Sequence, residues 1–188
     1  MTTQRTPTRA LKGTEGFTLV ELLVTLLLMT VLLALVATAL RHYWWVQSLE
    51  GGQDGIVTDL RGLQQRVSSE TFPVVYGARF TVGSSRWQNV RYDPVANSCS
   101  AVREGDLDGG EFSGGVVVES GVFEEYITGG NNASDGCTSG LSGASVVFFF
   151  ARGTATPGQL TLVHPTLDRR KDVCVTGLTA RVDEGACS

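Results

Sequence analysis

A long apolar segment close to the N-terminus constrains what this chain can fold into more than any other feature. From Phe17 to Leu40 the residues are apolar except for threonines and one carboxylate, Glu21. As a helix, a stretch of this length spans the hydrocarbon core of a bilayer, which is about 30 Å thick. We therefore expect residues 17–45 to form a membrane-spanning helix.

The residues on either side of this segment predict its orientation. Arg5, Arg9 and Lys12 precede it, and little net positive charge follows directly after it. By the positive-inside rule, this distribution places the N-terminus in the cytoplasm and the rest of the chain outside it. The sequence His-Tyr-Trp-Trp at 42–45 is typical of the aromatic residues that lie at the far membrane interface.

Two ordinary explanations of the segment remain open at this point. A cleaved secretory signal could use the small residues at 37–39, but its apolar region would be only about 7–15 residues long. A plain membrane anchor accounts for the length and the flanking charge but gives no reason for Glu21. An ionisable side chain within a membrane costs roughly 2.5–3.5 kcal/mol on insertion scales and usually has a function.

Residues 16–21 read Gly-Phe-Thr-Leu-Val-Glu. With the basic leader and the apolar run, they resemble the class III signal of type IV pilins and type II secretion pseudopilins. The resemblance implies that a prepilin peptidase removes residues 1–16, cutting between Gly16 and Phe17, and methylates the new amine of Phe17. It also implies that Glu21 pairs with the N-terminal amine of a neighbouring subunit in a filament.

Residues 46–69 continue the apolar helix as an amphipathic one. Apolar residues recur at spacings of three, four and seven with polar residues between them, which predicts an apolar stripe packed on a sheet. Gly51, Gly52 and Gly55 interrupt the pattern, and each costs about 1 kcal/mol relative to alanine in a helix. We expect a kink or a local loss of helix there. The stripe consists of Val46, Leu49, Ile56, Leu60, Leu63 and Val67.

After Pro73 the pattern changes to short β-type runs separated by turns rich in Gly, Asn and Asp. A helix followed by consecutive strands predicts an α+β fold, with the helix over an antiparallel sheet and a β-rich head at 70–188. Residues 106–110 and 129–143 read as loops. The expected strands are 74–82, 86–92, 116–122, 146–151, 160–163 and 173–182.

Residues 146–182 are similar to the closing strands of GspH/FimT-like minor pseudopilins and minor pilins. Those proteins have a Gly-rich turn after one strand and end on a strand close to Thr-Gly-Arg-Val, where this chain has Ala180 in place of the glycine. The resemblance implies a structural subunit that initiates or tips a filament. Its partners would be other pilin or pseudopilin subunits, the prepilin peptidase and the membrane. The alternative is a DNA- or ligand-binding minor pilin of a competence or adhesion filament.

The four cysteines all follow the apolar segment, and their even number indicates disulfides formed in an oxidising compartment. Their spacing contains no CxxC pair, which argues against a zinc site. Three pairings are open. We favour Cys174 with Cys187, which would hold the C-terminal end, and Cys99 with Cys137.

Nothing in the sequence predicts an enzyme or a cofactor. No nucleophile elbow or phosphate-binding loop occurs, and we expect His42 and His164 to be surface or interface residues. Asp106, Asp108 and Glu111 could hold calcium, although the spacing is not that of an EF-hand, and a solvated acidic loop is the better interpretation.

The charge balance argues against a broad nucleic-acid surface. The formal net charge is −4, and the leader contributes +2 through Arg5, Arg9 and Lys12 against Glu15, which leaves −6 for residues 17–188. One basic cluster stands in the head and could contact DNA or another ligand, although a solvated turn is the simpler interpretation. The cluster consists of Arg169, Arg170 and Lys171.

Overall fold

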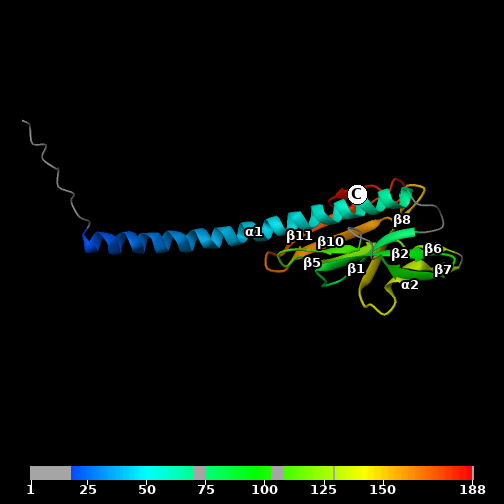
Figure 1. Cartoon of the computed structure of the whole chain (residues 1–188), viewed down its shortest axis with the longest axis horizontal. Coiled ribbons are helices and arrows are strands. Elements are labelled where there is room, and N and C mark those ends of the chain that lie inside the picture. The colour runs from blue at the N-terminus through cyan, green and yellow to red at the C-terminus, as the bar shows by residue number, and fades with distance from the viewer. Residues whose placement is uncertain (1–17, 70–74, 103–107, 129, 188) are drawn as a thin grey trace, which may run out of the picture. The chain divides into compact units, whose positions relative to one another are not determined.

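The computed structural model describes residues 18–69, 75–102, 108–128 and 130–187. The chain divides into two compact units, residues 1–41 and 42–188. Helix α1 (Leu19–Ser69) contributes to both, and all the strands and helix α2 (Ala133–Thr138) belong to the second, which we call the head (Figure 1). The prediction of an α+β fold with a helix packed on antiparallel sheets is confirmed.

The first unit is the apolar part of α1. Its side chains are exposed, and within the described residues α1 is the one helix long and apolar enough to cross a membrane. The hydroxyls of Thr25, Thr30 and Thr38 each donate to the carbonyl three residues earlier, at 2.8–2.9 Å. Because these polar groups are satisfied inside the helix, the threonines do not disqualify it as a membrane span.

In the head, residues 42–69 of α1 bury five of the six residues of the predicted apolar stripe, with Ile56 and Leu63 fully buried, and Val46 is half-buried. The expected local loss of helix at the glycines is wrong, since the helix is continuous from Leu19 to Ser69. One of the glycines has a packing reason. Gly52 is buried, and a Cβ there would lie 3.4 Å from the Phe112 ring and 3.6 Å from Val116.

The strands form two main antiparallel sheets. The first has the order β3-β2-β1-β8-β9, with β4 also paired to β2, and the second has the order β12-β11-β10-β5. Strands β6 and β7 form a separate pair. The bounds in the first sheet are β1 Val75–Thr81, β2 Arg86–Asp93, β3 Ser98–Ala101, β4 Gly109–Glu111, β8 Ala144–Phe150 and β9 Thr154–Ala155. Those of the other strands are β5 Val117–Phe123, β10 Gly158–His164, β11 Arg169–Val175, β12 Val182–Glu184, β6 Ile127–Thr128 and β7 Asn131–Asn132.

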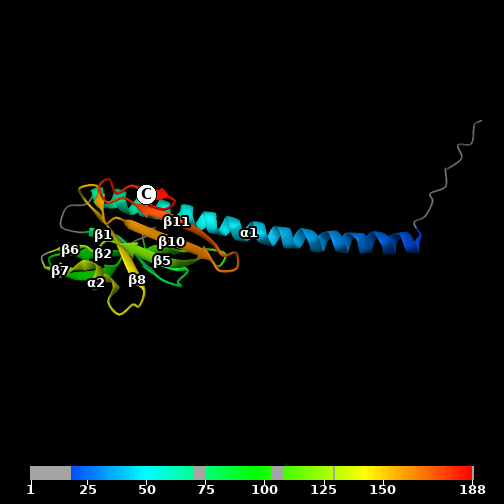
Figure 2. The same ribbon diagram turned by 180° about the vertical axis from the view of Figure 1, so that it is seen from behind.

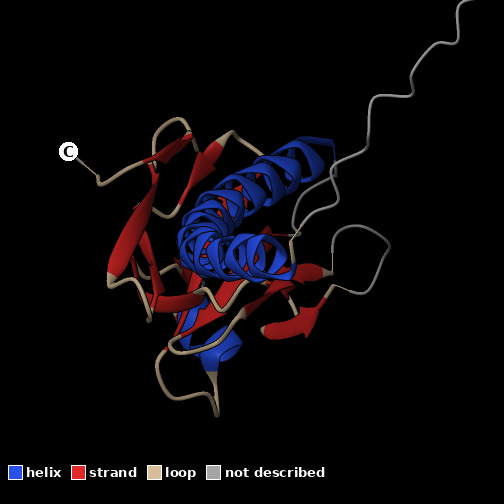
Figure 3. Ribbon diagram, turned by 90° about the vertical axis from the view of Figure 1, so that its left-hand side faces the viewer, coloured by secondary structure: helices blue, strands red, loops and turns tan. Residues whose placement is uncertain are grey.

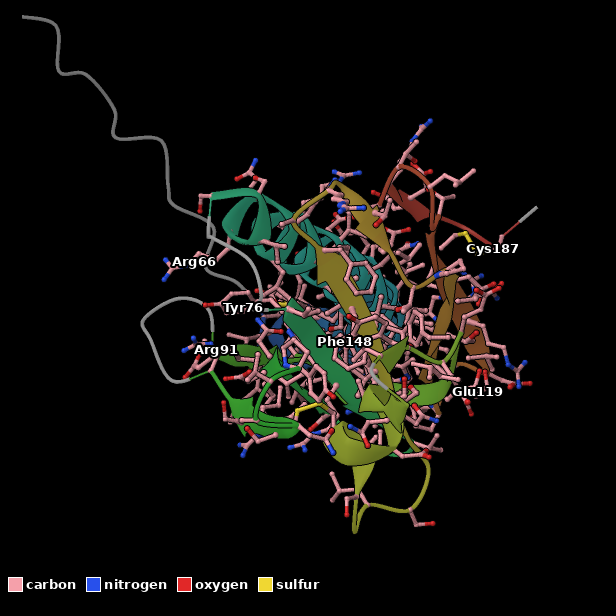
Figure 4. The ribbon with its side chains drawn as sticks, turned by 90° about the vertical axis from the view of Figure 1, so that its right-hand side faces the viewer. Arg66, Tyr76, Arg91, Glu119, Phe148 and Cys187 are labelled. Carbon is pink, nitrogen blue, oxygen red and sulfur yellow. A yellow bond between two sulfur atoms is a disulfide. The ribbon has the colours of Figure 1, made fainter. Side chains whose placement is uncertain are left out.

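Two apolar cores hold the head together. The larger core lies between α1 and both sheets. Figure 3 shows the strands of the head alongside the helix. The smaller lies on the opposite face of the first sheet, where Tyr92 and Phe148 pack beneath α2. Figure 4 shows Phe148 in the interior of the head. The first sheet is therefore buried on both faces, which accounts for the uninterrupted apolar run of β8.

Polar side chains fix the position of α1 on the sheets. The Gln53 side chain donates to the carbonyl oxygen of Asp172 at 2.7 Å, and Arg61 donates to that of Val182 at 2.9 Å. Between them, the Asp59 carboxylate accepts from the Trp87 indole at 2.6 Å and from the Asn89 amide at 3.0 Å.

Most expected strands are present, but three further expectations of local structure are wrong. Residues 173–182 are not one strand, because β11 ends at Val175 and the chain turns through Ala180, whose φ is +48°, before β12. The expected loop at 129–143 contains α2. The expected loop at 106–110 ends in β4, which pairs Gly110 with Trp87 of β2.

Candidate functional site

The predicted cleavage site, Gly16 and Phe17, lies outside the described residues. The structure begins one residue later, where Thr18 caps α1: its hydroxyl accepts from the backbone N–H of Glu21 at 3.2 Å. Glu21 therefore lies in the first turn of the helix, where the unpaired backbone N–H groups favour a negative charge.

Glu21 has no ion-pair partner among the described residues of this chain. The side chains around it, such as Leu22 and Leu23, are apolar and exposed. A carboxylate in such surroundings is stabilised only if a cation comes from elsewhere, because an uncompensated charge in an apolar environment is costly. The arrangement is suited to pairing with a cation on another molecule.

The structure joins Cys99 to Cys137 and Cys174 to Cys187, the pairing that we favour from the sequence. The first disulfide connects β3 to α2 and so secures the cover of the smaller core. The second connects β11 to the C-terminal tail. Figure 4 shows Cys187 at the outer side of the head.

The three basic residues do not form a turn, because they begin strand β11. The Arg170 guanidinium contacts the Glu119 carboxylate at 2.6 Å and Asp168 at 3.6 Å, and the Glu119 carboxylate raises the pKa of Arg170. Lys171 lies 3.9 Å from Glu50. Acidic neighbours therefore compensate two of the three cations, which weakens the case for phosphate contacts.

The calcium candidate is only partly visible, because Asp106 lies outside the described residues. Glu111 is engaged in an ion pair with Arg86 at 3.0 Å. In the part of the chain that the structure describes, no three His, Cys, Asp or Glu side chains come together as a metal site would require.

His164 corrects our expectation of a surface residue. It is buried, and its ring lies 5.6 Å from that of Trp45. Its Nε2 atom is 2.9 Å from the carbonyl oxygen of Gly114, so Nε2 carries the proton, while Nδ1 is buried without a partner among the described residues. The imidazole therefore packs between Trp45 of α1 and the carbonyl of Gly114. His42 is exposed, as expected.

Residues 11–37 match the family described as the prokaryotic N-terminal methylation motif. No curated protein matches the chain significantly in sequence. The match to the motif covers the last six residues of the leader, 11–16, the capped start of α1 and Glu21.

Two solved structures share the fold, and both are of the minor pseudopilin EpsH from the type II secretion system of Vibrio cholerae. One aligns with a TM-score of 0.50 and 12% identity over 74% of this chain and 97% of that chain. The other aligns with a TM-score of 0.51 and 14% identity over 76% and 96%. The chain thus carries a prepilin-type methylation motif and has the fold of a minor pseudopilin.

Proposed function

We propose that this protein is a structural subunit, a minor pilin or minor pseudopilin, of a type IV pilus or type II secretion-like filament. The observation that carries the proposal is the combination of the methylation motif at residues 11–37 with a pseudopilin-like head on the same helix. Such a subunit works by assembly rather than by catalysis, and it initiates the filament or stands at its tip.

Maturation begins at the membrane. A prepilin peptidase cuts between Gly16 and Phe17 and methylates the amine of Phe17, which removes residues 1–16. Residues 17–45 anchor the chain in the cytoplasmic membrane with the N-terminus in the cytoplasm, and residues 46–188 lie outside. The two disulfides of the head support the oxidising location.

Assembly then uses the apolar helix and its carboxylate. The exposed apolar side chains of residues 19–41 pack against the helices of other subunits. Glu21 accepts the N-terminal amine of a neighbour, which supplies a cation that no described residue of this chain brings to it. Because burying one charge without the other is strongly unfavourable, the pair sets the axial position of each added subunit.

A role in DNA binding is the alternative that the basic cluster would serve. Arg170 and Lys171 face the carboxylates of Glu119 and Glu50, and Arg169 is exposed. A single uncompensated arginine makes too few phosphate contacts for useful affinity at physiological salt. We therefore rank this alternative second.

Mass spectrometry of the N-terminus of the membrane-associated protein tests the proposal. We expect a chain that starts at methylated Phe17. The variant Gly16→Val should remain unprocessed, because the peptidase must approach a residue without a side chain. A mature wild-type chain starting at Leu40 would indicate a secretory signal, and an intact Met1 would indicate a plain anchor. Either result would overturn the proposal.

A further inference from the structure

The outer face of the second sheet carries a feature to which the proposed assembly assigns no role. Val122, Gln159 and Cys174 are partners across β5, β10 and β11, so their side chains project from one face. Leu160 follows Gln159 in β10, and Val173 precedes Cys174 in β11. Both side chains therefore project from the other face, where they are buried in the core with α1. Figure 2 shows these three strands side by side.

A groove of about 680 Å³ lies at one end of this face. Its walls are the end of β5, the start of β10, the end of β11 with the turn after it, and the C-terminal tail, which is held in place by the Cys174–Cys187 disulfide. Much of the lining is apolar, and Val122 is 71% exposed. The volume is within the range of ligand sites, roughly 300–1,000 Å³.

The charged groups of the groove are all acidic. Glu124 and Asp183 line it, and no Lys or Arg does. Asp183 is paired with Arg181 at 2.8 Å. The Glu124 carboxylate has neither a hydrogen bond nor an ion pair among the described residues. It also borders a second hollow of about 360 Å³, which Tyr126 lines.

We propose that this groove binds a polypeptide segment in which an apolar side chain stands next to a lysine or arginine. The apolar side chain covers Val122 and the disulfide, and the cation pairs with Glu124. Charge complementarity selects this partner, because the unpaired Glu124 carboxylate repels a phosphate backbone and attracts a cationic peptide. An apolar contact ringed by polar groups is the usual form of a protein-recognition site.

The groove is separate from the residues that the proposed assembly uses, since its lining includes no residue of α1. A subunit that fails to bind peptide can still be processed and assembled. A subunit that fails to be processed or assembled can still bind the peptide, because residues of the head alone form the groove.

The test uses the mature full-length chain in detergent micelles and a fluorescein-labelled, end-blocked Leu-Lys-Leu-Lys-Leu peptide. Fluorescence anisotropy is measured at physiological salt, with the signal from empty micelles subtracted. We expect saturable binding, and a loss of about tenfold or more in affinity for Glu124→Lys and for Val122→Asp. The matched control is Asp135→Lys, which makes the same charge change at an exposed position on α2 and should alter the affinity less than about twofold.

Three results would overturn the proposal. One is no saturable binding up to about 1 mM peptide. Another is equal weakening by Asp135→Lys and Glu124→Lys, which would mean general attraction to an acidic head. The third is binding of a Leu-Glu-Leu-Glu-Leu peptide as tightly as the lysine peptide. Circular dichroism checks that each variant is folded, and Val122→Thr replaces Val122→Asp if that variant is not.

Discussion

The two disulfides close loops of different length, and this difference predicts how much each stabilises the head. Cys99 and Cys137 are separated by 38 residues, and Cys174 and Cys187 by 13. If a disulfide acts mainly by restricting the unfolded chain, these separations give about 4 kcal/mol for the first and about 3 kcal/mol for the second at 25 °C. The first should contribute the larger share.

The surroundings of the two disulfides in the folded head also predict that the first contributes the larger share. Cys137 is 2% exposed and packs in the smaller core with Val90 and Phe148, whereas Cys187 is exposed and Cys174, at 7%, belongs to neither core. Replacing Cys137 by alanine therefore also removes buried sulfur from a core, which adds to the loss. For the double variant Cys99→Ala/Cys137→Ala, we expect a free energy of unfolding at least 1 kcal/mol below that of Cys174→Ala/Cys187→Ala.

Urea denaturation of the mature chain in detergent micelles measures this difference. Tryptophan fluorescence is a suitable signal, because Trp87 packs on Phe112 at a centroid distance of 4.6 Å. Both double variants lack free thiols, so exchange and dimerisation do not interfere, and the reduced wild type serves as a further reference. Equal losses, or a larger loss for the Cys174–Cys187 pair, would refute the loop-length reasoning.

Three further predictions concern single positions. Glu21→Val should be processed normally but absent from sheared filaments on immunoblots, because the neighbour's amine loses its partner; normal incorporation would remove the pairing argument. Gly55→Ala should stabilise the head by about 1 kcal/mol in urea denaturation, since a Cβ there meets nothing within 4 Å, whereas Gly52→Leu should destabilise it by about 1–3 kcal/mol against Phe112. A head that is more stable with Gly52→Leu than with Gly55→Ala would contradict the packing at Gly52. Burial, and after it Tyr126 and Asp93, raise the pKa of Tyr92 above its ordinary 10.0. Its contribution to stability is therefore complete below pH 10 and is lost as the pH rises through the raised pKa. Stability curves between pH 9 and 12 should fall less steeply for Tyr92→Phe, and identical slopes would exclude the effect.

The features that could be predicted from the sequence are those that a local pattern of residues determines. The apolar run and the stripe that follows it predict α1, and the β-branched and aromatic runs predict the central strands. The signal at residues 16–21 is local as well. The glycines at 51–55 misled the prediction because intrinsic propensity was weighed without the packing that overrides it at Gly52.

The features that escaped prediction depend on residues far apart in the chain. Trp87 and Asn89 reach Asp59 across 28 and 30 positions. The burial of His164 depends on Trp45, more than a hundred residues away. Helix α2 is too short to show a periodic pattern, and it is capped by Asn132, whose side chain accepts from Ser134 and Asp135. That residue also begins a sequon, but its amide is already committed to the cap and to Glu125.

The polar contacts under α1 explain why the helix takes one position on the sheets. An apolar stripe alone could pack at several registers, because moving a helix by one turn, about 5.4 Å, brings similar residues into contact. Asp59 removes that freedom, since only one register gives its carboxylate both the Trp87 indole and the Asn89 amide. A shift by one turn would leave a charged group and an indole N–H unpaired in a half-buried site, at a cost of about 1–3 kcal/mol for each. Gln53 and Arg61 reach backbone carbonyls on β11 and β12 and select the same register. These contacts fix residues 42–69 of α1 on the sheets, which the place proposed for this subunit in a filament would require.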